Sequence, residues 1–599
     1  MIKLSDYVIK RLEETGVKHM FMLPGGGAMH LNDSLGKSEK IEYVCCLHEQ
    51  ACAIAAEAYA RVNNTLGLLM VTTGPGGTNA LTGIAGAYIE STPVFCVSGQ
   101  VKRADMINNQ GIRQQGMQEV DIVSIVKPIT KYAALVDDPN TIRYHIERAL
   151  YEATHGRKGP VWLDIPLDVQ ATVIDENNLE GFTPEPTEVN NQLEEQVLEI
   201  IELINNSERP VLLAGNGIRM SGGIDSFKKL IEILNIPVLT TWNGIDIIPE
   251  DNPLYFGRPG GLGHRYANFI QQNSDLFLSI GARLNLLQTG YNFDSFAREA
   301  KKIIVDIDNN ELHKINVRAD IPVCADAKDF IELLIKHADK IMSNTRNDWF
   351  DYAQRMKSKY PIILSEYRKQ EKLVNTYCLI DTISDKMTAD DIYVSGSSGS
   401  CIDISMQAFK VKEGQRAFCT KGLAAMGYGL PSSIGACLAG GKRKTVSVIG
   451  DGGFVMNIQE LETVRRLNLP VKLFVLCNQG YGAIQATQTN IFNKHFVGCN
   501  AQSGVTIPPI ARVAEAFGVK SLVIDSNCEL DEKIQAAFDY DGPVVAEVHT
   551  PIELTAQPKQ VSYKRKDGQM ESLPLEYMKP MLSEEEMREN MIISPYKMN

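Results

Sequence analysis

The stretch VSVIGDGGFVMNIQELETVRRLNLPVKLFVLCNQGYGAIQ, residues 446–485, decides the fold. It opens with an apolar run that ends at Gly450-Asp451-Gly452, continues through a helical segment, and returns to an apolar run that ends at Asn478. Strand, helix and strand in this order form a βαβ unit with two parallel strands. Because the carboxyl ends of parallel strands meet at one edge of the sheet, Asp451 and Asn478 are expected to lie close together there.

Alternating strand-like and helical runs divide the whole chain into three α/β blocks. The first covers residues 1–175, the second 190–340 and the third 373–555, and each predicts a doubly wound parallel sheet. A polar, proline-bearing stretch at 175–196 links the first two blocks. The last segment, 556–599, is rich in charge and methionine and shows no strand pattern, so we expect a C-terminal tail.

Composition argues against several classes of function. The 599 residues carry a formal net charge of −13, whereas binding to nucleic acid needs a basic surface. The 12 cysteines form no CxxC pair and no Cys/His cluster, which argues against a zinc site. No apolar run reaches the roughly 20 residues that span a bilayer, and the charged N-terminus does not resemble a signal peptide. We therefore expect a cytoplasmic protein that has neither nucleic acid nor a membrane as its partner.

Asp451 and Asn478 carry the kinds of oxygen that Mg²⁺ prefers. This ion takes hard oxygen donors in octahedral geometry and commonly shares them with a bound phosphate. Neighbouring glycines let the backbone approach phosphate oxygens closely. The alternative is an ordinary turn at each strand end, where Asp-Gly and Asn-Gln-Gly are common. The spacing of the two residues between apolar strands favours a metal–diphosphate site.

The GDG sequence followed by Asn at the end of the next strand resembles the fingerprint of thiamine-diphosphate enzymes. The resemblance implies that Asp451, Asn478 and the carbonyl of Gly480 bind Mg²⁺. The chain departs from the family at Cys477, where many members have another Asn. The resemblance places these further residues around the diphosphate: Gly450, Gly452, Gly453, Tyr481 and Gly482.

The first block resembles the pyrimidine-binding domain of acetolactate synthases. Three motifs carry the resemblance: LPGGGAMH (23–30), CCLHEQACAIAAEAYAR (45–61) and VTTGPGGTNALTGIAGAYIESTPVFCVSGQ (71–100). It implies that Glu49 hydrogen-bonds N1′ of the aminopyrimidine and so activates the thiamine ring. The alternative for Glu49 is a glutamate that only stabilises the start of a helix. Pro75 and Asn79 are expected along the pyrimidine, whereas His48 is interpreted as structural.

Two further motifs in the third block resemble the same family. TKGLAAMGYGLPSSIGA (420–436) places Met426 where a bulky side chain supports the bent cofactor, although a lone methionine is more often core filler. VSGSSGSCID (394–403) resembles a second diphosphate loop, with Gly399, Ser400 and Cys401 as candidates.

The second block has two interpretations, an FAD-binding domain or a structural α/β domain. The resemblance implies FAD without net redox work, and its candidate contacts are Gly215, Gly217, Arg283, Asp306, Asp308 and Asp326. The family has another Arg shortly after Arg283, but here Leu286 and Leu287 occupy that stretch. The sequence leaves the choice between the two interpretations open.

Substrate selection depends on positions where this chain departs from acetolactate synthases. The place of a family Trp is taken by Thr487, and that of a nearby Met by Ala483, which predicts a wider or more polar acceptor pocket. Gln118 is retained and is a candidate contact for substrate. His30 replaces a usual Pro and is either a polar contact for the acceptor or a surface residue at a helix start.

The resemblance covers residues 1 to about 555 and implies a pyrimidine-binding, a middle and a diphosphate-binding domain. It predicts decarboxylation of a 2-oxoacid, with pyruvate as the expected donor, and transfer of the two-carbon unit to an acceptor carbonyl. Active sites between subunits imply a homodimer or homotetramer. The tail resembles that of carboligases acting on nucleotide-linked keto-sugars. The alternatives are an acetolactate synthase catalytic subunit and a non-catalytic homologue that binds the cofactor only to fold.

Overall fold

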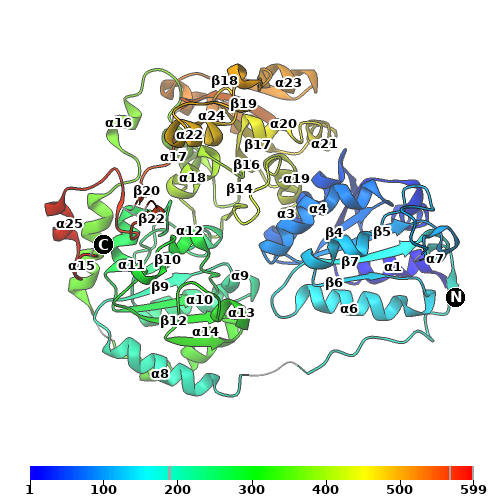
Figure 1. Cartoon of the computed structure of the whole chain (residues 1–599), viewed down its shortest axis with the longest axis horizontal. Coiled ribbons are helices and arrows are strands. Elements are labelled where there is room, and N and C mark those ends of the chain that lie inside the picture. The colour runs from blue at the N-terminus through cyan, green and yellow to red at the C-terminus, as the bar shows by residue number, and fades with distance from the viewer. Residues whose placement is uncertain are drawn as a thin grey trace.

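Three separate parallel sheets follow one another along the chain in the computed structural model (Figure 1). The structure describes residues 1–108, 110–186, 190–343, 345–552, 554–564, 568 and 570–596. Parts of the predicted linker and tail, residues 187–189, 565–567, 569 and 597–599, lie outside these ranges. The prediction of three parallel-sheet α/β domains is confirmed. Among the described helices, none has the length and apolar character needed to cross a membrane.

The N-terminal domain is built on six strands and the helices between them. These are β2 (His19–Met22), β3 (Glu42–Cys45), β4 (Gly67–Val71), β5 (Val94–Gln100), β6 (Tyr132–Leu135) and β7 (Val161–Pro166), with α1 (Leu4–Glu13), α2 (Met29–Gly36), α3 (Glu49–Asn63), α4 (Pro75–Ile89) and α6 (Ile142–Thr154). The strand order is β3-β2-β4-β5-β7-β6, and all neighbouring pairs are parallel. The strands β4, β5 and β7 are buried throughout and mostly apolar, as expected for strands covered on both faces.

The middle domain has a five-stranded sheet between two apolar layers. Its elements are β9 (Pro210–Ala214), β10 (Val238–Thr240), β11 (Leu276–Ile280), β12 (Lys301–Asp306) and β13 (Ile321–Cys324), with α8 (Leu193–Asn206), α10 (Ile224–Leu234), α11 (Arg265–Gln272), α12 (Leu286–Thr289), α14 (Ala327–Lys336) and α15 (Asn347–Lys359). The order is β10-β9-β11-β12-β13, and all pairs are parallel. The chain leaves β9 in one direction for β10 and returns on its other side for β11, so a topological switch point lies between β9 and β11.

The C-terminal domain contains the stretch that decides the fold. Its elements are β14 (Ile392–Ser395), β15 (Arg416–Phe418), β16 (Thr445–Gly450), β17 (Val471–Cys477), β18 (Lys520–Ile524) and β19 (Val544–His549), with α17 (Thr376–Lys386), α18 (Ser400–Ala408), α19 (Gly429–Ala439), α20 (Asp451–Val455), α21 (Glu460–Arg466), α22 (Gly482–Ile491), α23 (Ile510–Ala516) and α24 (Leu530–Asp539). The order is β15-β14-β16-β17-β19-β18, with all pairs parallel. The predicted pairing of the strand that ends at Gly450 with the strand that ends at Cys477 is present as β16 and β17.

The N-terminal and C-terminal domains meet where α3 crosses α19, at the boundary visible in Figure 1. A Cβ atom on Gly435 would lie 2.0 Å from the carbonyl oxygen of Ala55, so only glycine permits this approach of the two backbones. Beside this contact, buried Tyr428 donates a hydrogen bond to Glu57 (2.8 Å) and Arg61 donates to the carbonyl of Cys419 (2.8 Å). Small residues and paired charges therefore fix the two domains against each other.

Arg258 connects the middle domain to the C-terminal domain. Its side chain is 2% exposed, and its guanidinium donates to the carbonyls of Met406 (2.6 Å) and Phe409 (2.9 Å) and to the hydroxyl of Tyr255 (2.7 Å). A further bond reaches the carbonyl of Gln407 (3.2 Å). Four hydrogen-bond acceptors thus compensate the burial of this charge. Three of them are carbonyls at the end of α18 and in the residue after it.

The C-terminal segment is docked on the middle domain, contrary to the expectation of a tail without strands. It forms two short antiparallel pairs, β20 (Lys559–Gln560) with β23 (Met578–Lys579) and β21 (Ser562–Lys564) with β22 (Met570–Ser572), and ends in α25 (Glu584–Asn590). Buried amides of α11 and the residue after it receive this segment: Asn268 donates to the carbonyl of Leu575 (3.0 Å), and Asn273 donates to that of Asn590 (3.2 Å). Figure 1 shows α25 beside α15. Strands of two or three residues are too short to produce an alternating pattern in a sequence.

We predict that Arg258→Met lowers the free energy of unfolding by about 3 kcal/mol or more, because three buried carbonyls lose their donor at about 1–3 kcal/mol each. The matched control is Arg355→Met, which removes an exposed cation 5.5 Å from the ring of Tyr352. Calorimetric unfolding of both variants tests the difference. Equal, small changes in both would show that Arg258 contributes little to this joint.

Candidate cofactor sites

Two helices begin beside each other at the carboxyl edge of the C-terminal sheet. α18 starts after Gly399 and α22 starts at Gly482, and a Cβ atom on Gly399 would lie 3.6 Å from the Cβ of Ala483. The N-terminus of a helix presents unpaired N–H groups and a partial positive charge, which together suit phosphate oxygens. Backbone donors from both helices are therefore available at one place, as a diphosphate site requires.

Asp451, the first residue of α20, is buried at the same edge. Its Oδ1 accepts a hydrogen bond from Gly452 N (2.7 Å), and its Oδ2 accepts one from Asn478 N (3.2 Å). Burial raises the pKa of Asp451 to about 6, while hydrogen bonds from the surrounding backbone N–H groups oppose that rise. The structure thus brings Asp451 and Asn478 into direct contact.

The side-chain oxygen of Asn478 is the observation that points to a metal. Asn478 Oδ1 is buried, and no donor in the described part of the chain reaches it. An unpaired buried acceptor costs free energy, and a cation would satisfy it. A carboxylate, an amide oxygen and a backbone carbonyl are hard donors, so these residues fit Mg²⁺. Among the described residues, no group of three or more His, Cys, Asp or Glu side chains is arranged to hold a metal.

The loop after Asn478 has a conformation that only glycine adopts readily. Gly480 has φ +136°, and a Cβ atom there would lie 2.2 Å from the carbonyl oxygen of Cys499. Gly482 lies as tightly against Asn478, since its Cβ would be 2.5 Å from Asn478 Nδ2. The two glycines therefore hold the backbone close to Asn478, where the carbonyl of Gly480 was predicted to act.

Ser400 and Cys401 present their backbones, and not their side chains, to the diphosphate edge. The hydroxyl of Ser400 donates to the carbonyl of Leu554 (2.7 Å), and the thiol of Cys401 donates to that of Ser398 (2.9 Å). Burial raises the pKa of Cys401 to about 11, so it stays a thiol. What these candidates can offer a phosphate is the N–H groups at the start of α18.

Met426 lies where a methionine could support the cofactor ring. A Cβ atom on Gly452 would be 3.4 Å from Met426 Cε and 2.4 Å from the ring of Tyr481. These three predicted residues therefore share one place beside Asp451. Of the other glycines predicted there, Gly450 faces open space and Gly453 makes only ordinary contacts.

Glu49 begins α3 at the carboxyl edge of the N-terminal sheet and is 6% exposed. Asn79, on α4, donates a hydrogen bond to Glu49 Oε2 (3.0 Å), so two residues predicted at the pyrimidine are paired. His48 caps α3 by accepting a hydrogen bond from Gln50 N (3.1 Å). This is the structural role that the sequence suggested for His48.

Pro75 and Gln118 lie at the same edge as Glu49. Pro75 is the first residue of α4, and a Cβ atom on the preceding Gly74 would lie 2.2 Å from the carbonyl oxygen of Gln118. Gln118 has φ +66°, is exposed, and belongs to the loop between β5 and β6. The structure therefore gathers Glu49, Asn79, Pro75 and Gln118 at one edge of the sheet.

The residues predicted to select the acceptor lie on exposed or half-buried positions. Thr487 is exposed on α22, and its hydroxyl donates to the carbonyl of Ala483 one turn earlier (3.0 Å). His30 is half-buried on α2. Sequence reasoning missed Gln485 on the same helix, whose buried Nε2 finds no acceptor among the described residues. Ala483, Ile484 and Thr487 on the same helix are exposed, and this one-sided burial of α22 was not visible in its sequence.

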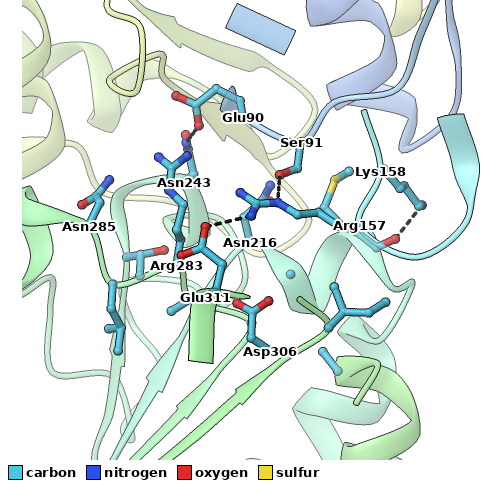
Figure 2. Close-up of a pocket in the computed structure, with 18 of the residues that line it drawn as sticks. Glu90, Ser91, Arg157, Lys158, Asn216, Asn243, Arg283, Asn285, Asp306 and Glu311 are labelled. Carbon is cyan, nitrogen blue, oxygen red and sulfur yellow. Dashed lines mark hydrogen bonds and ion pairs between the residues drawn. The ribbon is translucent and has the colours of Figure 1, made fainter. Parts of the chain in front are cut away.

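A cavity of about 470 Å³ lies where all three domains meet, and we call it the three-domain cavity (Figure 2). Its floor is the carboxyl edge of the middle sheet at the switch point between β9 and β11. The N-terminal domain adds residues 89–91 and 154–158, and the C-terminal domain adds Cys419, Lys421 and Gly422. A cavity of this size at a switch point is typical of small-molecule sites in open α/β sheets.

Most of the residues predicted to contact FAD line this cavity. The residues that do so are Gly217, Arg283, Asp306 and Asp326. Gly215 does not line the cavity; it packs against the backbone of Gly281, whose carbonyl oxygen would lie 2.1 Å from a Cβ atom on Gly215. Burial raises the pKa of Asp306, whose Oδ1 accepts a hydrogen bond from Asp308 N (2.9 Å). Asp326 caps α14. Asp308 caps the short helix α13 (Asn309–Leu312), which follows β12.

An arginine of another domain also reaches the three-domain cavity. Leu287 lines the cavity, but Arg157 reaches it from the N-terminal domain and pairs with Asp308 and Glu311 (both 2.8 Å). Figure 2 shows this guanidinium between Ser91 and Glu311. The sequence analysis did not find Arg157, since nothing local to residues 154–158 indicates contact with the middle domain.

Comparison with known families agrees with this architecture. Three models match: "Thiamine pyrophosphate enzyme, N-terminal TPP binding domain" at residues 2–125, the central domain at 197–334 and the C-terminal TPP binding domain at 397–548. Thiamine pyrophosphate is another name for thiamine diphosphate. The chain therefore belongs to the thiamine pyrophosphate enzyme family.

Within this family the chain is similar to acetolactate synthases. It is 33% identical to acetolactate synthase, chloroplastic, of Arabidopsis thaliana over 92% of this chain and 81% of that protein. It is 33% identical to the probable acetolactate synthase large subunit of Methanocaldococcus jannaschii, covering 91% and 92% of the two chains. It is 32% identical to the acetolactate synthase large subunit of Pyropia yezoensis over 90% of each. The protein is thus an acetolactate-synthase-like, thiamine-diphosphate-dependent enzyme.

We predict that Asp451→Ala weakens Mg²⁺-dependent binding of thiamine diphosphate by roughly 100-fold or more, because Asp451 is the one charged side chain among the three predicted protein ligands. Titration calorimetry at fixed Mg²⁺ measures the affinity. Asp525→Ala, at the end of β18 on the same sheet edge, removes a carboxylate paired with His549 and should leave the affinity unchanged. Equal affinities for Asp451→Ala and the native protein would refute the metal role.

Proposed function

We propose that the protein decarboxylates a 2-oxoacid, with pyruvate as donor, and joins the remaining two-carbon unit to an acceptor carbonyl. The observation that carries the proposal is the buried Oδ1 of Asn478, which no donor of the described residues reaches, beside the buried carboxylate of Asp451. A metal–diphosphate group satisfies both, and the family membership names that group. The intact Glu49–Asn79 pair supports catalysis over a cofactor that serves only folding.

Asp451, Asn478 and the carbonyl of Gly480 would hold Mg²⁺, and the starts of α18 and α22 would hold the diphosphate oxygens. Met426 would support the ring junction and bring the two rings into a reactive orientation. When bound, thiamine diphosphate supplies the electron sink that lets CO₂ leave.

Glu49 would act on the proton at N1′ of the aminopyrimidine. A carboxyl group that holds a proton there favours the tautomer able to act as a base within the cofactor. Its place at the start of a helix and its burial keep water away from this exchange, while the bond from Asn79 fixes its orientation. Glu49 therefore needs both its carboxylate and its position.

A bulky acceptor is the best-supported second substrate. Thr487 and Ala483 are small side chains on α22, directly after the metal loop, so that helix leaves more room than the Trp and Met of acetolactate synthases. The likeness of the tail to carboligases of nucleotide-linked keto-sugars favours a sugar ketone. An acetolactate synthase, with a second 2-oxoacid as acceptor, is the second candidate and is favoured by the 33% identity.

We further propose that two copies of the chain form each active site. Glu49, Asn79 and Gln118 lie at one sheet edge and Asp451 and Asn478 at another, and each edge is bordered by exposed apolar side chains. These are Met29, Leu47, Ile112 and Met117 at the first, and Met456, Ile484 and Ile491 at the second. Association of the edges in a homodimer, or a dimer of dimers, would cover this apolar surface.

The three-domain cavity is the proposed place of FAD, bound without net redox work. Arg283 and Arg157 offer guanidinium groups for its phosphates, and Asp306 offers a carboxylate for ribose hydroxyls.

We predict that the purified protein binds FAD and that Arg283→Met weakens binding roughly tenfold, the loss of one charge-assisted hydrogen bond. Flavin fluorescence titration measures both. Arg318→Met, exposed and away from the cavity, serves as control, and binding of ADP without any binding of FAD would contradict the proposal.

The proposed reaction is tested by product analysis with NMR and mass spectrometry. The protein receives thiamine diphosphate, Mg²⁺ and pyruvate, with and without a nucleotide-linked 4-keto-deoxysugar. We expect slow CO₂ release from pyruvate alone and a two-carbon adduct when the sugar is present. Acetolactate formed at a useful rate from pyruvate alone would make the second candidate correct.

In the same assay Glu49→Gln should retain the cofactor and lose turnover by roughly 100-fold or more, because the proton at N1′ loses its carboxylate partner. A near-normal rate would refute the role of Glu49.

A further inference from the structure

Glu90 joins all three domains through one carboxylate. It follows α4 in the N-terminal domain, and its Oε1 accepts hydrogen bonds from Gly422 N (2.8 Å) and Lys421 N (3.3 Å) of the C-terminal domain. Its Oε2 accepts one from Asn243 Nδ2 (2.8 Å) of the middle domain. Figure 2 shows Glu90 above Asn243 at the rim of the three-domain cavity.

Glu90 is hydrogen-bonded to the segment of residues 419–427, which runs from the three-domain cavity to the proposed thiamine diphosphate site. Its first part, Cys419, Lys421 and Gly422, lines the cavity, and its last part carries Met426 beside Gly452. Between them the segment has no regular structure, and Ala424 has φ +54°, a conformation that costs free energy in a residue with a side chain. Contacts outside the segment must therefore hold it.

Glu90 makes two of the external hydrogen bonds of this segment, near its middle. The two ends are held separately, by Arg61 donating to the carbonyl of Cys419 (2.8 Å) and Asn457 donating to that of Gly427 (2.8 Å). Lys421 Nζ pairs with Asp403 on α18 (2.8 Å), and Asn243 Oδ1 lies 3.4 Å from Cys419 N. A Cβ atom on Gly422 would lie 2.4 Å from Ile89 Cγ2 and 2.8 Å from Glu90 Oε1. The segment is thus built to lie directly against the end of α4.

We propose that Glu90 is a positioning residue that holds residues 419–427 in the conformation in which Met426 supports the bent thiamine cofactor. The inference rests on the proposed function. Glu90 lies at the three-domain cavity and is not one of the residues proposed to bind thiamine diphosphate. It acts on that site through two backbone N–H groups of the segment and through Asn243, which fixes the carboxylate from the opposite side. Glutamate suits this task because all three partners are donors and both of its oxygens are acceptors.

A glutamine at position 90 would have the shape of the glutamate but could not accept hydrogen bonds at both terminal atoms. In Glu90→Gln, one of the two terminal atoms becomes an NH₂ group that faces either the backbone donors or Asn243, so one contact becomes donor against donor. We expect thiamine diphosphate to bind roughly tenfold more weakly at saturating Mg²⁺, the effect of one lost charge-assisted hydrogen bond. Glu90→Asp keeps the charge and should retain part of the affinity.

The test combines two measurements on the full-length protein. Titration calorimetry gives the affinity for thiamine diphosphate, and hydrogen exchange by mass spectrometry follows residues 419–427 in the cofactor-free protein. In Glu90→Gln, exchange should rise in this segment and stay unchanged in β16 and β17. The control is Asp275→Asn, which removes a carboxylate that accepts from Glu208 N and Arg209 N, far along the chain from this segment. It should leave both readouts as in the native protein.

Gly422→Ala provides a second perturbation if Glu90→Gln does not fold, since its methyl group pushes the segment away from Ile89. It should produce the same weakened affinity and the same local exchange. Native affinity and native exchange in either folded variant would overturn the inference while leaving the proposed function intact. Failure of the native protein itself to bind thiamine diphosphate would overturn the proposed function, and this inference with it.

Discussion

A buried acceptor that no donor of the described residues reaches is the constraint around which the proposed cofactor site is arranged. Leaving the buried Asn478 Oδ1 without a hydrogen-bond donor costs free energy. The carboxylate of Asp451 next to it adds a buried charge. Both follow from the same topology, because parallel β16 and β17 end at one edge. The glycines that follow, Gly480 and Gly482, leave the backbone close to this place. The fold thus specifies the place at which we propose that a cation binds.

The two other sheets depend on joints that keep them at fixed positions around this site. α3 and α19 approach through glycine and alanine, Arg258 fixes the middle domain to the end of α18, and Glu90 connects the three domains at the cavity. The second and third joints each place a buried or half-buried charge against two or more backbone groups. Such contacts are costly to break singly, so they favour one arrangement of the domains.

Local pattern and chemistry made part of this structure predictable from the sequence. The βαβ unit with Asp451 and Asn478 could be derived because strand ends and glycines are local signals. The short strands of the C-terminal segment gave no pattern, since two or three residues are too few for one. Contacts with the middle domain help to hold them, such as the bond from Gln560 N to the carbonyl of Gly261 (2.7 Å). Arg157 and Glu90 were also beyond reach, because their partners lie in other domains. Sequence reasoning therefore located residues that gather at strand ends and missed those that make contacts between domains.

The most direct test of the whole account is the rate of hydrogen–deuterium exchange at the thiazolium C2 of bound thiamine diphosphate, followed by rapid acid quench and NMR. This rate depends on the diphosphate anchor, the bent conformation and Glu49 together, and it needs no knowledge of the acceptor. The account predicts exchange much faster than in free thiamine diphosphate, and loss of that acceleration in Glu49→Gln at saturating cofactor. Exchange no faster on the native protein than in solution would contradict it.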